Sequence, residues 1–415
     1  MITLLEETRT EVALASWTNT IKRSALQEML AAASRPGVIS FALGLPAPEL
    51  FPVHEYGEAA AAVLRSDPRA LQYQPPFAPL KSQVVELMRR RGVFCREEQV
   101  FLTAGAQQGM NLLVRLLLEP GGQLLLEDII YPGFQQVIEP FAPDLLLVST
   151  DAQEGMNVDE VEAVLKSGRR PSFIYAIPDG HNPLGVSLSR RKREKLVDLA
   201  GTYGVPIIED DAYGFLHYDG PLDPPMRSMD EDWVFYVGSF SKILAPALRV
   251  GWVIVPEKLL RPLSVIKEAT DIDTATFSQR AVSAYLAAGH LDNHISRLHE
   301  EYRLRRQVMH DALLKHFPAH AEWQKPKSGL FIWVDLPGEL DTTELLQHAI
   351  GKEQVAFVPG GAFRVNSHWP QRQSLRLNFS HCAPPQIEEG IARLARAIAD
   401  LSGEAKCYDQ LIPLN

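Results

Sequence analysis

The sequence reads Gly238-Ser239-Phe240-Ser241-Lys242-Ile243-Leu244 and shortly afterwards Leu248-Arg249-Val250-Gly251-Trp252. This segment follows an apolar run, Val234 to Val237, that we expect to form a buried strand. Its lysine stands between two hydroxyl side chains and among small or apolar neighbours, which solvate an ammonium group poorly. Such a lysine is suited to bind a carbonyl group as a Schiff base, while the hydroxyl groups and the arginine can hold a phosphate nearby.

This combination indicates pyridoxal 5′-phosphate bound through Lys242. Taken alone, the segment is also compatible with a surface lysine after a strand and with an arginine that caps a carboxylate. The remainder of the chain is needed to choose between these two interpretations.

The composition limits the class of protein. The chain has 415 residues, of which 46% are hydrophobic and 22% are charged, as is typical of a globular protein of two or three domains. Its formal net charge of −10 predicts no general attraction to nucleic acid or to an anionic membrane. The three cysteines lie far apart and the histidines show no metal-ligand spacing, so we expect no metal site.

The hydropathy pattern favours a cytoplasmic protein. The first residues run into acidic side chains, whereas a signal peptide has a positive start and a longer apolar stretch. No segment approaches the roughly 20 apolar residues that a membrane span needs. The cysteines are therefore expected to be reduced thiols.

Short apolar runs alternate with helix-period segments in the middle of the chain. The runs mostly do not alternate in polarity, as is typical of strands buried on both faces. They predict an α/β domain of three layers, in which helices cover a mainly parallel seven-stranded sheet. The expected strands are Val100–Thr103, Gln123–Glu127, Leu145–Val148, Phe173–Ile177, Pro206–Glu209, Val234–Val237 and Val250–Val255, and the helices include Gln107–Leu118 and Ser189–Tyr203.

The domain organisation follows from these patterns. We expect an N-terminal arm and substrate segment over residues 1–45, a large domain over 46–295, a small α+β domain over 296–405 and a tail over 406–415. The charged run Arg297 to Arg306 predicts a solvated helix face, although a long helix that bridges two domains would show the same pattern. The elements expected in the small domain are strands at Gly329–Val334, Ala356–Val358 and Leu375–Phe379, a helix from Thr342 and a last helix from Pro385 to Leu401.

Chemically distinctive residues follow the expected strands, at the edge where parallel sheets bind ligands. After the first strand, the small residues of Thr103 to Gly109 open a helix, so backbone N–H groups and the helix dipole can bind an anion. A tight turn needs the same small residues, so this signal is weak alone. After the second strand, Tyr131 is equally compatible with stacking on a flat ring and with a place in the core.

Two further segments follow later strands. After the fourth, Asn182 places an amide at the strand tip within a Pro- and Gly-rich turn, and its neighbour His181 is more typical of a structural residue than of a catalytic one. After the fifth, Asp210 and Asp211 are adjacent carboxylates that are costly to bury without partners. A protonated pyridine nitrogen would be such a partner, whereas a helix N-cap would explain only one of them.

With these motifs in this order, the chain resembles a fold-type I pyridoxal-phosphate enzyme of the class I/II aminotransferase superfamily. Over about residues 20–400 it is most similar to the aminoadipate, kynurenine and aromatic aminotransferase group and to the aminotransferase-like domain of MocR-type regulators. The resemblance implies three catalytic residues. Lys242 matches the Schiff-base lysine, Asp210 matches the aspartate on the pyridine nitrogen, and Tyr213 matches, with Asn182, the partners of the ring 3′ oxygen.

The resemblance also implies the remaining binding residues. Tyr131 matches the stacking aromatic, and Tyr73 matches a tyrosine that reaches the phosphate of the neighbouring subunit, so a homodimer with shared sites is implied. Arg376 matches the arginine that clamps the substrate α-carboxylate, and Gly44 matches the substrate segment. The residues that match the phosphate cup are Gly105, Ala106, Gln107, Ser239, Ser241 and Arg249, and Asn182 is implied on the substrate side as well.

Three positions depart from the family pattern. Ala106 stands where a hydroxyl residue is usual, Leu184 where the family often has Thr, and Ala78 where a glycine is usual. No catalytic group is lost. Together these changes point to a specialised branch of the family.

The activity that the resemblance implies is transfer of the amino group from an L-amino acid to a 2-oxo acid by a ping-pong mechanism. The freed Lys242 would act as the base at the substrate Cα. The alternative is a cyclase, an elimination or replacement enzyme, or an amino-acid oxidase, because these reactions share the same Cα carbanion.

A cofactor-sensing regulator would need an N-terminal DNA-binding domain and a basic surface, but the substrate segment is reached by residue 44. The side-chain pocket is expected near residues 15–45, where Arg23 is either a surface residue or a partner for an acidic substrate.

Overall fold

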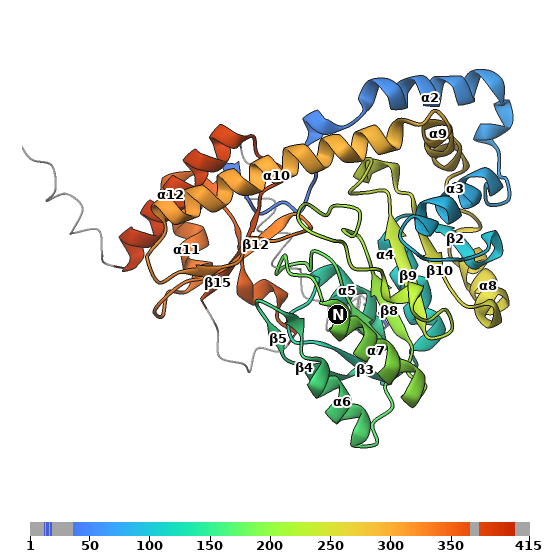
Figure 1. Cartoon of the computed structure of the whole chain (residues 1–415), viewed down its shortest axis with the longest axis horizontal. Coiled ribbons are helices and arrows are strands. Elements are labelled where there is room, and N and C mark those ends of the chain that lie inside the picture. The colour runs from blue at the N-terminus through green and yellow to red at the C-terminus, as the bar shows by residue number, and fades with distance from the viewer. Residues whose placement is uncertain (1–11, 13, 16, 19–35, 366–372, 403–415) are drawn as a thin grey trace, which may run out of the picture.

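The computed structural model describes residues 12, 14, 15, 17, 18, 36–365 and 373–402. Most of the predicted arm, including Arg23, and the predicted tail therefore lie outside the described residues. Figure 1 shows a larger part, built around a central sheet, and a smaller part, with the long helix α10 (His290–His316) running along both.

A seven-stranded sheet forms the centre of the larger part, as the sequence predicted. All neighbouring strands are parallel except β10, which is antiparallel to the strands on either side. The residues of β8, β9 and β10 are all buried, which explains why these runs do not alternate in polarity. In spatial order the strands are β2 (Val100–Thr103), β10 (Gly251–Ile254), β9 (Val234–Ser239), β8 (Ile207–Asp210), β7 (Ile174–Ala176), β3 (Gln123–Glu127) and β4 (Asp144–Val148).

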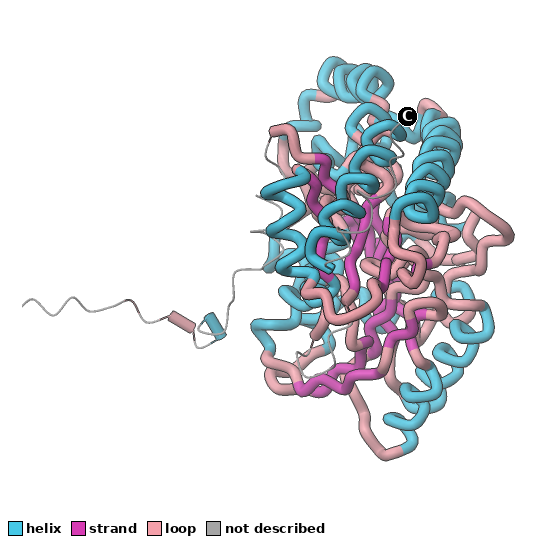
Figure 2. The backbone as a smooth tube through the Cα atoms, turned by 90° about the vertical axis from the view of Figure 1, so that its left-hand side faces the viewer, coloured by secondary structure: helices cyan, strands magenta, loops and turns pink. Residues whose placement is uncertain are grey.

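Helices cover both faces of this sheet, so the three-layer prediction is confirmed (Figure 2). Successive strand residues point to opposite faces: Ile208 packs in one apolar cluster and Ile207 in another. The first cluster includes side chains of α4 (Ala106–Leu117), α5 (Pro132–Ile138) and α8 (Leu260–Asp271), and the second includes those of α6 (Val158–Lys166) and α7 (Arg190–Tyr203).

The smaller part is a four-stranded antiparallel sheet with helices, which confirms the α+β prediction. The predicted strand Ala356–Val358 is instead two short strands, because the chain changes partner within it. β13 (Val355–Ala356) pairs in parallel with the N-terminal strand β1 (Ile39–Ser40), whereas β14 pairs with β15. The sheet runs β11 (Glu322–Trp323), β12 (Phe331–Asp335), β15 (Ser374–Asn378) and β14 (Val358–Pro359), and its helices are α10, α11 (Thr342–His348) and α12 (Pro384–Ser402).

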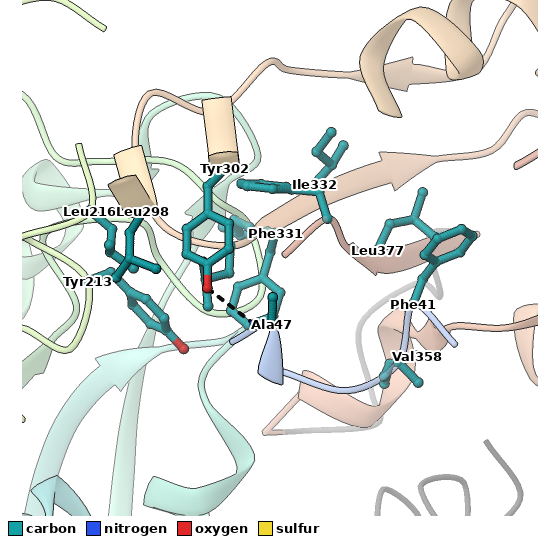
Figure 3. Packing of buried hydrophobic residues seen from close by; sticks show 14 of the residues in the cluster. Phe41, Ala47, Tyr213, Leu216, Leu298, Tyr302, Phe331, Ile332, Val358 and Leu377 are labelled. Carbon is teal, nitrogen blue, oxygen red and sulfur yellow. Dashed lines mark hydrogen bonds between the residues drawn. The ribbon is translucent and has the colours of Figure 1, made fainter. Parts of the chain in front are cut away.

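The N-terminal segment is held between the two parts (Figure 3). Phe41 lies beside Val358 and Leu377 of the small sheet, and the backbone N–H of Ala47 donates a 3.3 Å hydrogen bond to the hydroxyl of Tyr302 on α10. The segment after β1 is therefore fixed to both the small sheet and α10.

Helix α10 bridges the two parts, and the prediction of a solvated face is wrong at the end of its charged run. Arg305 and Arg306 are buried, because they form ion pairs with Glu49 and Asp219 at 2.8 Å and 2.6 Å. The alternative of a bridging helix is the one that the structure supports. Among the described residues, the other α-helices are α2 (Val53–Ser66), α3 (Ala78–Arg89) and α9 (Thr276–Ala287), and the other two strands, β5 (Thr150–Asp151) and β6 (Gly155–Met156), form a hairpin.

In the part of the chain that the structure describes, no helix is long and apolar enough to cross a membrane. The predicted domain bounds stay a prediction.

Candidate active site

A cavity of about 350 Å³ lies at the carboxyl ends of β8 and β9 and reaches β15 of the small sheet. This is the edge at which the sequence predicted a ligand site. The structure brings together here all the predicted site residues except Gly105 and Tyr73. The cavity is lined by Gly44, Ala106, Gln107, Tyr131, Asn182, Asp210, Tyr213, Ser239, Ser241, Lys242, Arg249 and Arg376.

Lys242 projects from the turn after β9 toward the N-terminal segment. Its Nζ donates a 2.8 Å hydrogen bond to the carbonyl oxygen of Gly44. Burial, together with the nearby cations Arg376 and Arg249, lowers the pKa of Lys242 to about 8. The amine therefore loses its proton much more readily than an exposed lysine, which makes it a nucleophile and a base.

Asp210 ends β8 with one oxygen satisfied and one free. Its Oδ2 accepts a 2.7 Å hydrogen bond from the hydroxyl of Tyr175, whereas Oδ1 is buried without a hydrogen-bond partner among the described residues. Burial raises the pKa of Asp210 to about 6. A positively charged group in the cavity that donates an N–H hydrogen bond to Oδ1 would give this oxygen a partner and favour the ionised carboxylate.

The adjacent carboxylate has a different environment. Asp211 accepts hydrogen bonds from Arg91 Nη1 at 2.7 Å, from the hydroxyl of Tyr236 at 2.8 Å and from the backbone N–H of Gly214 at 2.7 Å. Both of its oxygens are thus used inside the fold. Of the two carboxylates, Asp210 is the one that faces a ligand.

Arg376 crosses from β15 into the cavity. Its Nη1 donates to Asn182 Oδ1 at 2.8 Å and its Nη2 to the carbonyl oxygen of Ala42 at 2.6 Å. The rings of Phe331 and Phe363 lie 4.3 Å and 4.8 Å from the guanidinium carbon. Burial lowers the pKa of Arg376 to about 10, which leaves it cationic at neutral pH. A planar cation held in this way suits a carboxylate ligand.

The part of the cavity next to the start of α4 can hold an anion. Ser239 Oγ lies 2.9 Å from Ser241 Oγ, and Arg249 Nη2 donates to the carbonyl oxygen of Ala104 at 2.9 Å. Gly105 does not line the cavity itself, but it has a φ of +81°, and a Cβ there would lie 2.5 Å from Arg249 Nη2. Glycine is therefore required for the arginine to lie against the turn that opens α4, where the helix dipole favours an anion.

Two tyrosines also line the cavity. A Cβ on Gly133 would lie 2.3 Å from the Tyr131 ring, so this glycine makes room for it. Tyr213 meets the ring of Phe331 edge to face, with 5.8 Å between ring centroids. Burial raises the pKa of both tyrosines, so their hydroxyl groups keep their protons.

Besides Gly105, two of the residues that the sequence singled out lie outside the cavity, Tyr73 and His181. Tyr73 is 78% exposed, so a contact with the site would need another chain. His181 is buried with Nε2 3.2 Å from Glu127 Oε2 and does not line the cavity, which agrees with a structural place. Among the residues described, no group of three His, Cys, Asp or Glu side chains could hold a metal ion.

Sequence reasoning missed Tyr175, which lies within an expected strand. Its signal was a hydroxyl in a strand buried on both faces, where every polar group needs a partner. Other lining residues carry no chemical signal of their own: Ala42, Leu45, Met110, Ile177, Ala212 and Pro246.

Comparison with known proteins agrees with this geometry. The family model described as aminotransferase class I and II matches residues 38–394. The aromatic-amino-acid aminotransferase 1 of Thermococcus litoralis is 38% identical over 92% of this chain and 92% of its own, and the 2-aminoadipate transaminase of Thermus thermophilus is 37% identical over 92% and 95%. The crystal structure of LysN, the α-aminoadipate aminotransferase of Thermus thermophilus, complexed with N-(5′-phosphopyridoxyl)-L-leucine, has a TM-score of 0.86 and 35% identity, covering 94% of this chain and 98% of that one.

Proposed function

The chain belongs to the aminotransferase class I and II family and is a pyridoxal-phosphate-dependent aminotransferase, and we propose that its amino donor is an L-amino acid with a large side chain, aromatic or of the 2-aminoadipate type. The names of the relatives support this substrate class. They also favour transamination over the cyclase, elimination and oxidase alternatives. The single structural observation that carries the aminotransferase activity is that Lys242, Asp210 and Arg376 line one cavity.

The residues present fit the cofactor. Asp210 Oδ1 is a buried oxygen that lacks a partner, which a protonated ring nitrogen would supply. Ser239, Ser241 and Arg249 stand beside the N-terminus of α4 and would hold the phosphate. Pyridoxal 5′-phosphate, when bound, supplies an aldehyde that takes up amino groups and a ring that withdraws electrons. Tyr131 would lie against that ring.

The chain's own side chains then divide the work. Arg376 would hold the substrate α-carboxylate, with its guanidinium packed against the rings of Phe331 and Phe363. Lys242 Nζ, with its lowered pKa, would take the proton from the substrate Cα. Asp210 would keep a proton on the ring nitrogen. The Asn182 amide oxygen accepts from Arg376, and its N–H side interacts with the Tyr213 hydroxyl, so these two groups would hold the ring oxygen together.

We further propose a homodimer with shared sites and a cytoplasmic location. The exposed Tyr73 supports the homodimer, because its proposed role at the phosphate needs a second chain. The cytoplasmic location rests on the sequence patterns alone.

The proposed function is tested with purified protein and a panel of amino acids, with no oxo acid added. We expect one group, phenylalanine-like or 2-aminoadipate-like, to abolish the visible absorbance of the bound cofactor while one equivalent of its 2-oxo acid is released. Adding 2-oxoglutarate should restore the absorbance, and Lys242→Ala should lack both changes. Continuous release of ammonia or of a cyclic product without an acceptor would contradict transamination.

A further inference from the structure

Two buried tyrosines flank the strand that ends in the paired carboxylates. Tyr175 lies on β7 and Tyr236 on β9, the two neighbours of β8. The hydroxyl of Tyr175 donates to Asp210 Oδ2 at 2.7 Å, and that of Tyr236 donates to Asp211 Oδ2 at 2.8 Å. Each carboxylate thus accepts a hydrogen bond from one tyrosine, but only Asp210 has a second oxygen without a hydrogen-bond partner among the described residues, which a group in the cavity could use.

Tyr175 is held rigidly behind Asp210. Its ring stacks on Phe134 with 3.6 Å between centroids and 3° between planes, and its side chain is buried. The hydroxyl also lies 3.9 Å from Met110 Sδ. Tyr175 does not line the cavity, so its hydroxyl can influence a bound group only through the lining residues that it touches, and of these two Asp210 is the charged one.

From this geometry we propose that Tyr175 is a positioning residue: its hydroxyl fixes Asp210 Oδ2, so that Oδ1 is presented to the cofactor ring nitrogen and the shared proton stays on that nitrogen. The inference rests on the proposed role of Asp210. A hydrogen bond donated to a carboxylate spreads its charge and makes it a weaker base. Without this bond, Asp210 would take the proton from the ring nitrogen more readily.

The charges around Asp210 agree with this role. Burial and the neighbouring Asp211 raise the pKa of Asp210, while the Tyr175 hydrogen bond and His181 lower it. Burial also raises the pKa of Tyr175 well above its usual value, so its hydroxyl remains a donor. Tyr175 therefore opposes the tendency of the buried carboxylate to become neutral.

Tyr175→Phe tests the proposal, and Tyr236→Phe is its matched control, because both changes remove one buried hydroxyl beside β8. The first readout is the affinity of the cofactor-free protein for pyridoxal 5′-phosphate. We expect a loss of about tenfold in Tyr175→Phe and no more than twofold in Tyr236→Phe. Equal losses in both variants, or none in Tyr175→Phe, would overturn the proposal.

The second readout is the ¹⁵N chemical shift of pyridoxal 5′-phosphate labelled at the ring nitrogen, which reports the position of the proton. In Tyr175→Phe we expect the shift to move from the protonated toward the neutral pyridine, and in Tyr236→Phe we expect it to stay. An unchanged shift in a folded Tyr175→Phe protein would overturn the proposal.

A double-mutant cycle with Asp210→Asn tests whether Tyr175 acts through Asp210. In that background Tyr175→Phe should change the cofactor affinity less than twofold, and this comparison stays available if the single Tyr175→Phe variant folds poorly. A further large loss would overturn the inference. If Asp210→Asn alone leaves the affinity unchanged, the proposed role of Asp210 fails and the inference fails with it. If Asp210→Asn weakens binding and Tyr175→Phe does not, only the role of Tyr175 fails.

Discussion

Arg376 Nη1 lies 2.8 Å from Asn182 Oδ1, although 194 positions of the sequence separate the two residues. Arg376 belongs to the small sheet and Asn182 to the turn after β7 of the large one. The same guanidinium binds the carbonyl oxygen of Ala42 in the N-terminal segment. Three separate segments therefore meet at one buried cation, and the substrate side of the cavity depends on it.

We expect Arg376→Lys to lower kcat/KM for the amino-acid substrate by a factor on the order of 10², mainly through KM. Lysine keeps the charge but loses the planar fork and the contacts of that fork with the rings of Phe331 and Phe363, and a charge-assisted hydrogen bond contributes about 1.5–3 kcal/mol. Steady-state kinetics measure this loss. Arg393→Lys is the control, because this arginine pairs with Glu389 on α12 and does not line the cavity.

A substrate without a carboxylate shows whether Arg376 acts by binding that group. A substrate amine that lacks the carboxylate should react equally slowly with the wild-type protein and with Arg376→Lys. If the substitution slows that amine as much as it slows the amino acid, Arg376 does not act by holding a carboxylate.

The elements that the sequence predicts well are those whose signal is local. The buried runs give the seven strands to within a few residues, because strands covered on both faces are largely apolar. Polar residues directly after such runs are conspicuous, which is why Asp210, Asn182 and Lys242 could be found as candidates.

The features that could not be predicted depend on partners distant in sequence. The sequence shows two adjacent carboxylates, but only the contact of Asp211 with Arg91, 120 positions away, shows which one is satisfied inside the fold. Arg305 and Arg306 look solvated until Glu49 and Asp219 are placed beside them. The order of polar and apolar residues within one segment contains no information about its contacts with distant segments.

The lowered pKa of Lys242 predicts a pH profile for the reaction of the cofactor-free protein with pyridoxal 5′-phosphate. Only the neutral amine adds to a carbonyl group, so the rate should rise about tenfold per pH unit below pH 8 and level off above it. Adduct trapped with borohydride at intervals between about pH 6 and pH 10 measures this rate. Free Nα-acetyllysine is the control and should continue to accelerate toward its ordinary pKa of about 10.4. A profile for the protein that also keeps rising above pH 9 would contradict the lowered pKa.

We expect Asp210→Asn to stabilise the cofactor-free protein at pH 8. The pKa of Asp210 is raised from 3.8 to about 6 in the folded state, so its contribution to stability is fully present below the lower value and is lost as the pH rises through about 6. At pH 8 the buried carboxylate then costs about 3 kcal/mol, which the neutral amide avoids while it still accepts from Tyr175.

Urea unfolding at pH 8 and near pH 5 measures this difference in the free energy of unfolding. The advantage of Asp210→Asn should shrink toward pH 5, where much of the wild-type carboxyl group is neutral. Asp211→Asn is the comparison and should destabilise the protein at pH 8, because Asp211 pairs with Arg91. A lower stability of Asp210→Asn at pH 8 would show that the carboxylate already has a partner in the cofactor-free protein.

The proposed role of Tyr73 makes a prediction about mixed dimers. If the exposed Tyr73 completes the site of a second chain, a dimer of one Lys242→Ala chain and one Tyr73→Ala chain has both defects in one site and an intact second site. Random exchange of two variants gives half mixed dimers, so the mixture should regain roughly a quarter of the wild-type activity. Activity measured after unfolding and refolding the two variants together tests this, with each variant refolded alone as the control.

If Tyr73 instead serves the site of its own chain, every site in the mixed dimer carries one defect. The mixture would then be no more active than the average of the two variants, which would contradict a shared site.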